Sequence, residues 1–81
     1  MDANMKRDIL RRIILELLSN GDVHYTDLDK KVCTTGFPFA TSHTFRSQFH
    51  YLLKNGYVTK ISRVIYRITP KGQKYLELFT L

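Results

Sequence analysis

The chain has 81 residues and a mass of 9.5 kDa, which is the size of a single small domain and leaves no room for a second core. Its hydrophobic content of 43% is enough to bury a modest core, which argues against a disordered chain. No run of about 18 apolar residues is present, and the first residues lack the apolar segment of a signal peptide. These features predict one domain over residues 1–81, without a membrane span, in the cytoplasm.

The formal net charge of +6 is concentrated in the second half of the chain. Residues 41–81 contain seven Lys or Arg residues and a single acid, and no Asp or Glu lies between Asp29 and Glu77. A surface that faces only water normally mixes charges of both signs. We therefore expect the second half of the molecule to face a polyanion.

Residues with catalytic or metal-binding chemistry are few. The single cysteine, Cys33, excludes an internal disulfide and a multi-cysteine zinc site. His43 and His50 are seven residues apart, but only His24 and Cys33 remain as further ligands, so no metal is expected. The sequence has no Ser-His-Asp phrase, phosphate-binding glycine loop or paired carboxylates. We expect no enzyme, no cofactor and no small-molecule ligand.

The first predicted element is a helix over residues 5–19. Its apolar residues recur at spacings of three, four and seven, Asp2 or Asn4 can cap its start, and the pair Asn20-Gly21 ends it. Leu15 widens the apolar stripe on one flank. This extra width suggests a homodimer surface, which we place on helix one together with the C-terminal helix, at Leu78, Phe79 and Leu81.

A short extended piece, residues 23–25, precedes a second helix that ends near Thr34. Thr26 as the cap with Asp29 three residues on approximates a capping box. Leu28 and Val32 form the apolar pair of this helix, and Cys33 is expected to be a small core residue. The segment Thr35-Gly36-Phe37-Pro38 ends the helix. Tyr25, Phe37 and Phe39 are expected to pack in the core and the turn, and the alternative for Phe37 and Phe39 is an exposed apolar loop available to a partner.

The third helix begins at Thr41 or Ser42 and ends after about 13 residues at Asn55-Gly56. Its apolar stripe faces the core and consists of Phe45, Phe49, Leu52 and Leu53. The opposite face carries no carboxylate and consists of Ser42, His43, Arg46, Ser47, His50 and Lys54.

Two strands and a fourth helix complete the chain. Residues 57–62 and 64–69 are rich in β-branched and aromatic side chains, which predicts a hairpin that turns near Ser62-Arg63 without the usual glycine signal. Thr69 as the cap and Pro70 at the first helical position predict the start of the last helix. Its apolar stripe is Tyr75, Leu76 and Phe79.

Two segments carry a family resemblance: FRSQFHYLLKNGYVTK (residues 45–60) and YRITPKGQKYL (residues 66–76). They resemble the winged helix-turn-helix family of small archaeal and bacterial transcriptional regulators, some of them from viruses and plasmids. The resemblance covers the whole chain in element order and about thirty residues in motif. It implies a mostly α fold with a small β-hairpin: a three-helix core, a two-stranded wing and a C-terminal helix. It also implies sequence-specific binding of double-stranded DNA, and therefore association with the nucleoid.

The third helix is the element that such a protein places in the major groove, where Arg46 can bond bidentately to a guanine edge. The predicted major-groove residues are Ser42, His43, Thr44, Arg46, Ser47 and His50. The predicted contacts of the wing and its surroundings with backbone or minor groove are Lys54, Lys60, Arg63, Arg67 and Lys71. Each of these side chains could instead be an ordinary solvated residue. The alternative function is a winged-helix module that binds a protein partner without binding DNA.

Overall fold

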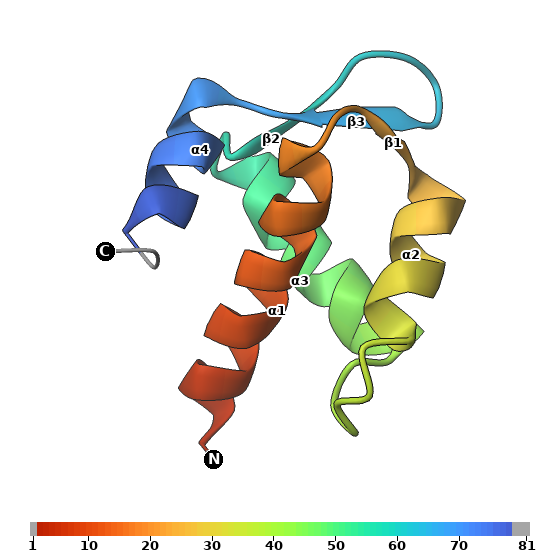
Figure 1. Ribbon diagram of the computed structural model, residues 1–81, viewed down its shortest axis with the longest axis vertical. Coiled ribbons are helices and arrows are strands. Elements are labelled where there is room, and N and C mark those ends of the chain that lie inside the picture. Colours follow the sequence, from red (N-terminus) through yellow and green to blue (C-terminus); the bar gives the residue numbers. More distant parts are fainter. Residues whose placement is uncertain (1, 79–81) are drawn as a thin grey trace.

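Residues 2–78 are described by the computed structural model of the protein, and they form four helices and three short strands. The mostly helical content that the sequence predicts is confirmed. Figure 1 shows the sheet at one end of the molecule, with α1, α2 and α3 extending from it in one direction. The elements in chain order are α1 Ala3–Ser19, β1 Val23–His24, α2 Tyr25–Cys33, α3 Ser42–Lys54, β2 Val58–Lys60, β3 Ile65–Ile68 and α4 Pro70–Glu77.

The sheet has three antiparallel strands in the order β1-β3-β2. The predicted hairpin corresponds to β2 and β3, in which Val58 lies opposite Ile68. The short extended piece before α2 becomes a third strand, because Val23 pairs with Tyr66 on the free edge of β3. The predicted two-stranded sheet is therefore incomplete. Residues 61–64 connect β2 to β3, and the Ile61 N–H donates to the Ile65 carbonyl oxygen across this loop at 3.0 Å.

Three of the four helices begin at the predicted caps. The Asp2 carboxylate accepts a hydrogen bond from the Met5 N–H at 2.8 Å, and Thr41 forms a capping box with Thr44 at the start of α3. The Thr69 hydroxyl accepts from the Gly72 N–H at 3.1 Å at the start of α4. These local signals depend on neighbouring residues alone, which explains why the sequence predicted them.

The predicted cap of α2 is wrong. The helix begins at Tyr25, and its cap is His24, whose Nδ1 accepts a hydrogen bond from the Thr26 N–H at 3.1 Å. His24 ends a strand and has extended backbone angles, so its ring already lies beside the first free N–H groups of the helix. Asp29 does not complete a capping box, because its carboxylate accepts a hydrogen bond from the Ser42 hydroxyl at 3.0 Å.

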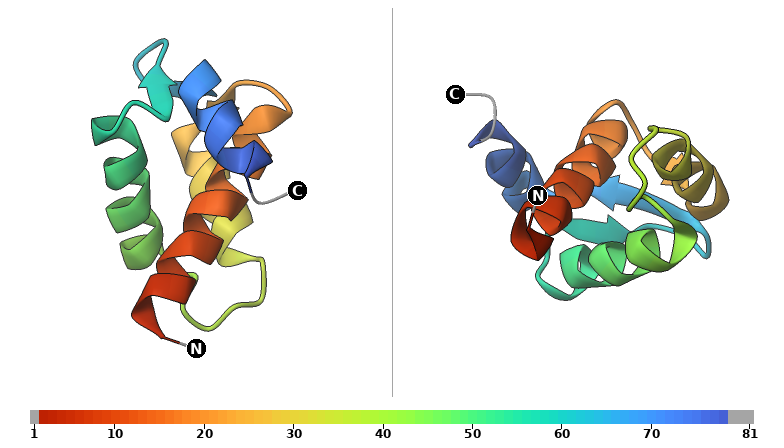
Figure 2. Two further views of the ribbon diagram at one scale, coloured as in Figure 1. Left: turned by 90° about the vertical axis from the view of Figure 1, so that its left-hand side faces the viewer. Right: turned by 90° about the horizontal axis from the view of Figure 1, so that it is seen from below.

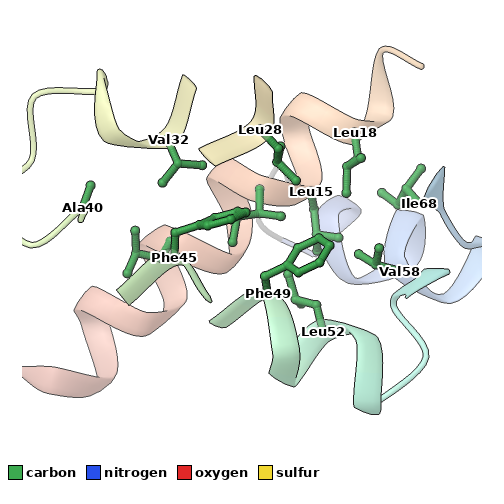
Figure 3. Packing of buried hydrophobic residues seen from close by; sticks show 12 residues of the cluster. Leu15, Leu18, Leu28, Val32, Ala40, Phe45, Phe49, Leu52, Val58 and Ile68 are labelled. Atoms are coloured by element: carbon green, nitrogen blue, oxygen red, sulfur yellow. The ribbon is translucent and has the colours of Figure 1, made fainter. Parts of the chain in front are cut away.

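The core is a cluster of buried side chains from α1, α2, α3 and the sheet. Figure 3 shows the rings of Phe45 and Phe49 extending from α3 toward the side chains of α1 and α2. Tyr25 lies against both rings, with centroid distances of 5.4 Å to each. Burying one such large side chain contributes about 1.5–3 kcal/mol. The buried apolar residues are Leu10, Ile14, Leu15, Leu18, Leu28, Val32, Ala40, Phe45, Phe49, Leu52, Val58 and Ile68.

Helix α1 uses its wide apolar stripe inside the chain. It packs against α2, α3, α4 and β3, and Ile13 and Leu17 on the flanks of the stripe lie against the core. The width that suggested a dimer surface on helix one is thus explained by neighbours on several sides. Leu78 is 71% exposed, and Phe79 and Leu81 lie outside the described residues.

Cys33 is exposed, so the prediction that it is a core residue is wrong. Phe37 is also exposed and packs in the turn rather than in the core. Leu28 and Val32 define the buried face of α2, and the residue after Val32 is turned about 100° away from that face. The ring of Phe37 stacks on that of Phe39 at 5.1 Å, and only Phe39 lies against the core. Within residues 2–78, no helix combines the length and hydropathy needed to cross a bilayer.

Candidate nucleic-acid interface

The outer face of α3 forms one edge of the molecule (Figure 2, left), with the β2–β3 loop beyond its C-terminal end. Phe45, Phe49 and Leu52 hold the inner face of the helix in the core. Gln48 is buried with them, and the residues on the opposite side of the helix point outward. The result is a row of exposed polar and basic side chains, which we call the α3 stripe: His43, Arg46, Ser47, His50 and Lys54.

The first four residues of the α3 stripe line a shallow hollow on the surface: His43, Arg46, Ser47 and His50. Within the described part of the chain, no carboxylate lies within 4.0 Å of the Arg46 guanidinium. Its planar set of N–H donors is therefore directed at solvent and can bind an external acceptor bidentately. Ser47 and the two imidazoles add groups that can donate or accept.

Ser42 and Thr44, also predicted to contact bases, hold the start of α3 instead. The Ser42 hydroxyl donates to the Asp29 carboxylate on α2. The Thr44 hydroxyl accepts from the Thr41 N–H at 2.9 Å and donates to the carbonyl oxygen of Phe39. Four of the six predicted residues thus share the exposed stripe, and the other two fix the helix that presents it.

Arg11 attaches α3 to α1 from the inner side. Its Nε donates to the side-chain oxygen of Gln48 at 2.8 Å, and its guanidinium carbon lies 3.7 Å from the centroid of the Tyr51 ring. Gln48 is only 8% exposed, so this hydrogen bond satisfies a polar group inside the fold. The sequence offered a signal for this role, because Arg11 shares the helical spacing of the buried residues Ile14 and Leu15.

Arg11 also reaches the last helix. The pKa of Tyr75 in α4 is raised by burial of its phenol, and this effect is opposed by a hydrogen bond with Arg11. One side chain of α1 therefore contacts both α3 and α4. A rotation of α3 would break the hydrogen bond between Arg11 and Gln48.

Two of the cations predicted to lie on the wing side are held by the chain itself. The guanidinium of Arg67 donates to both carboxylate oxygens of Asp22, at 2.9 and 3.0 Å. This pair lowers the pKa of Asp22, mainly through the hydrogen bond, and raises that of Arg67. The Lys71 ammonium donates to the Asn55 carbonyl oxygen at 2.7 Å and lies 4.8 Å from the centroid of the Tyr57 ring.

The other predicted cations on this side are exposed: Lys54 ends α3, Lys60 ends β2 and Arg63 lies in the β2–β3 loop. The loop also exposes Ile61 and Val64, one on each side of Arg63 along the chain, at 40% and 41%. All five predicted contacts are thus exposed, and two of them, Arg67 and Lys71, also contact groups of the chain itself.

The sequence did not indicate two further cations, which lie beside α3 on its α1 side. Lys6 and Arg7 in the first turns of α1 line a groove whose other wall includes His43 and Ser47. Their distance from the α3 stripe along the chain concealed this proximity.

A third hollow lies beside α4 and is walled by Tyr57, Lys71, Lys74, Tyr75, Glu77 and Leu78.

Among the described residues, no three His, Cys, Asp or Glu side chains come together as ligands for a metal ion.

The chain is similar to a solved structure of a transcriptional regulator from Clostridium thermocellum. The two superpose with a TM-score of 0.76 and are 31% identical, over 99% of this chain and 84% of that one. Neither a scan against protein-family models nor a search of curated proteins finds a match. An identity above 30% over nearly the whole length goes beyond likeness of fold. The chain therefore belongs to the family of this transcriptional regulator.

Proposed function

We propose that the protein is a transcriptional regulator that binds double-stranded DNA sequence-specifically through a winged helix-turn-helix. In this proposal α2 and α3 are the helix-turn-helix, α3 enters the major groove, and the β2–β3 hairpin is the wing. The observation that carries the proposal is the α3 stripe, an exposed row of polar and basic groups without a carboxylate on an edge of the molecule. The family relationship to a transcriptional regulator supports it. The role is one of binding rather than catalysis.

Arg46 is the residue proposed to read a base. A bidentate contact with guanine contributes about 1–3 kcal/mol of discrimination. Arg46→Ala should therefore weaken binding to a preferred duplex by that amount and weaken binding to random duplex less. The preferred duplex is first obtained by selection from a random pool, and both affinities are then measured by fluorescence anisotropy.

Lys30→Ala is the matched control, since it removes one positive charge from an exposed position on α2. It should change both affinities little. Equal losses on the preferred and the random duplex for Arg46→Ala would contradict the base-reading role. The logarithm of the wild-type affinity should fall linearly with the logarithm of salt concentration, because bound phosphates release counterions.

We further propose that two copies bind together through α4. The hollow beside α4 exposes Leu78 next to the rings of Tyr57 and Tyr75, which is apolar surface that a second copy can cover. A dimer of this kind would contact two half-sites about 34–36 Å apart. The selected duplexes should then contain a two-fold symmetric repeat, and Leu78→Lys should give monomers in analytical ultracentrifugation. Monomeric wild-type protein on an unsymmetric site would contradict this part of the proposal.

A protein-interaction module without DNA binding is the second candidate function. The same exposed apolar surface beside α4 favours it, since it suits a protein partner. Failure of the wild-type protein to bind any duplex at low salt would support this candidate and contradict DNA binding.

A further inference from the structure

The groove between α1 and α3 brings two cations from the first turns of α1 beside the α3 stripe. Lys6 and Arg7 line one wall, and His43 and Ser47 line the other. No Asp or Glu is among the described residues that line this groove. The basic surface of α3 is therefore continuous with that of α1.

The acidic residues near these cations face other groups. The Asp2 carboxylate caps α1 by accepting from the Met5 N–H at 2.8 Å, and Asp8 lies 3.7 Å from the Arg11 guanidinium. Lys6 lies 6.0 Å from the centroid of the Phe39 ring, and Arg7 donates to the side-chain oxygen of Asn4 at 3.3 Å. Neither of these neutral partners cancels a positive charge.

The opposite edge of α3 is different. There the Asp29 carboxylate lies 3.0 Å from the Ser42 hydroxyl and adds a negative charge at the start of the helix. The α2 side therefore carries charges of both signs, because the exposed cations Lys30 and Lys31 follow Asp29 on α2. The described lining of the α1 groove carries cations and no acid, so a phosphate is attracted more strongly to the α1 side.

The dimensions agree with this asymmetry. Packed helices lie about 8–10 Å apart, and the major groove of B-DNA is about 12 Å wide. When α3 fills the major groove, a DNA strand that borders this groove therefore passes over the helix packed beside α3. We infer that Lys6 and Arg7 bind phosphates of the strand on the α1 side, so that the DNA footprint extends from α3 onto the start of α1. This inference rests on the proposed function.

The test compares two double variants that lose the same charge. Lys6→Ala/Arg7→Ala should make the salt dependence of duplex binding shallower by about 2 in log–log slope, because each lost phosphate contact removes about 0.9. The loss of affinity should be the same on preferred and random duplexes, since phosphate contacts carry no sequence information. Lys30→Ala/Lys31→Ala on α2 should leave the slope unchanged.

The possible outcomes separate the two proposals. If the wild-type protein binds no duplex at low salt, the proposed function fails and the inference fails with it. If the wild type binds and both double variants shift the slope equally, the effect is one of net charge and the inference is wrong. A shallower slope in the α2 variant alone would place the DNA backbone on the α2 side of α3 and would contradict the inference. Helix content measured by circular dichroism verifies that each variant is folded, and Lys6→Gln/Arg7→Gln, which retains hydrogen-bonding side chains, should show the same shallower slope.

Discussion

The two flanks of α3 hold their cations in different ways. On the α1 flank, Lys6 and Arg7 border an open groove, and within residues 2–78 no carboxylate lies within 4.0 Å of either charge. On the sheet flank, Arg67 forms an ion pair with Asp22, and Lys71 donates to a backbone carbonyl. The two flanks therefore differ at Arg67, which a carboxylate pairs, whereas Lys71 contacts neutral groups, as Lys6 and Arg7 do.

Strand register explains the difference. Val23 pairs with Tyr66 in antiparallel strands, so Asp22 comes opposite Arg67. An exposed ion pair of this kind adds little stability, but it uses the Nε and one terminal nitrogen of the Arg67 guanidinium. The start of α1 has no such neighbour, because its acids cap the helix or face Arg11. The comparison predicts which substitutions affect the fold and which affect binding.

Gly72→Ala should have the largest effect on the fold, and it acts on the sheet flank. A Cβ at this buried position in α4 would overlap the Tyr57 carbonyl oxygen and come within 2.8 Å of the Ile68 side chain. Overpacking of this kind costs roughly 1–3 kcal/mol of unfolding free energy. Urea denaturation measures the loss. Gln73→Ala, at the exposed neighbouring position, is the control and should be near neutral. Equal stability of the two variants would show that α4 does not depend on this close approach.

Arg11→Ala should have the next largest effect, and it acts on the α1 flank. It leaves the nearly buried Gln48 amide without its partner and removes the contact with Tyr51, which costs about 1–2 kcal/mol. Thermal unfolding measures the loss. Arg46→Ala is the control, because it removes the same side chain from the exposed face and should lower DNA binding without lowering stability. A stability loss that is as large for Arg46→Ala would contradict the separate roles of these two arginines.

Asp22→Asn should have a smaller effect, on binding, and it tests whether the sheet flank can be recruited. The substitution releases the Arg67 guanidinium, so the log–log salt slope of duplex binding should steepen by about 0.9 if Arg67 reaches a phosphate. Adding Arg67→Ala to this variant should abolish the gain. An unchanged slope in Asp22→Asn would place Arg67 outside the DNA footprint.

The same variant tests the ion pair itself through pH. The folded-state pKa of Asp22 is lowered by the hydrogen bond from Arg67, so the pair stabilises the fold above the ordinary pKa of 3.8. This contribution is lost as the pH falls below 3.8 toward the lowered folded-state pKa. The unfolding free energy of the wild type should therefore fall more steeply with acid than that of Asp22→Asn. Parallel acid curves would show that the pair does not persist in solution.

The sequence by itself determined the elements whose signals are local. The spacing of Phe45, Phe49 and Leu52 and the cap at Thr41 placed α3 and its exposed face, because helical periodicity and capping involve only residues a few positions apart. The same holds for Thr69 and Pro70 at the start of α4. The resemblance of two segments to a family of regulators predicted DNA binding.

Only the tertiary structure decided which polar side chains are available. The pairing of β1 with β3 assigned His24 to a cap and Asp22 to Arg67, and the packing of α1 on α3 brought Arg11 to Gln48. These contacts join residues from different elements, and no local pattern encodes them. The concentration of positive charge in the second half of the sequence predicted a polyanionic partner, and the fold decided which cations lie beside α3.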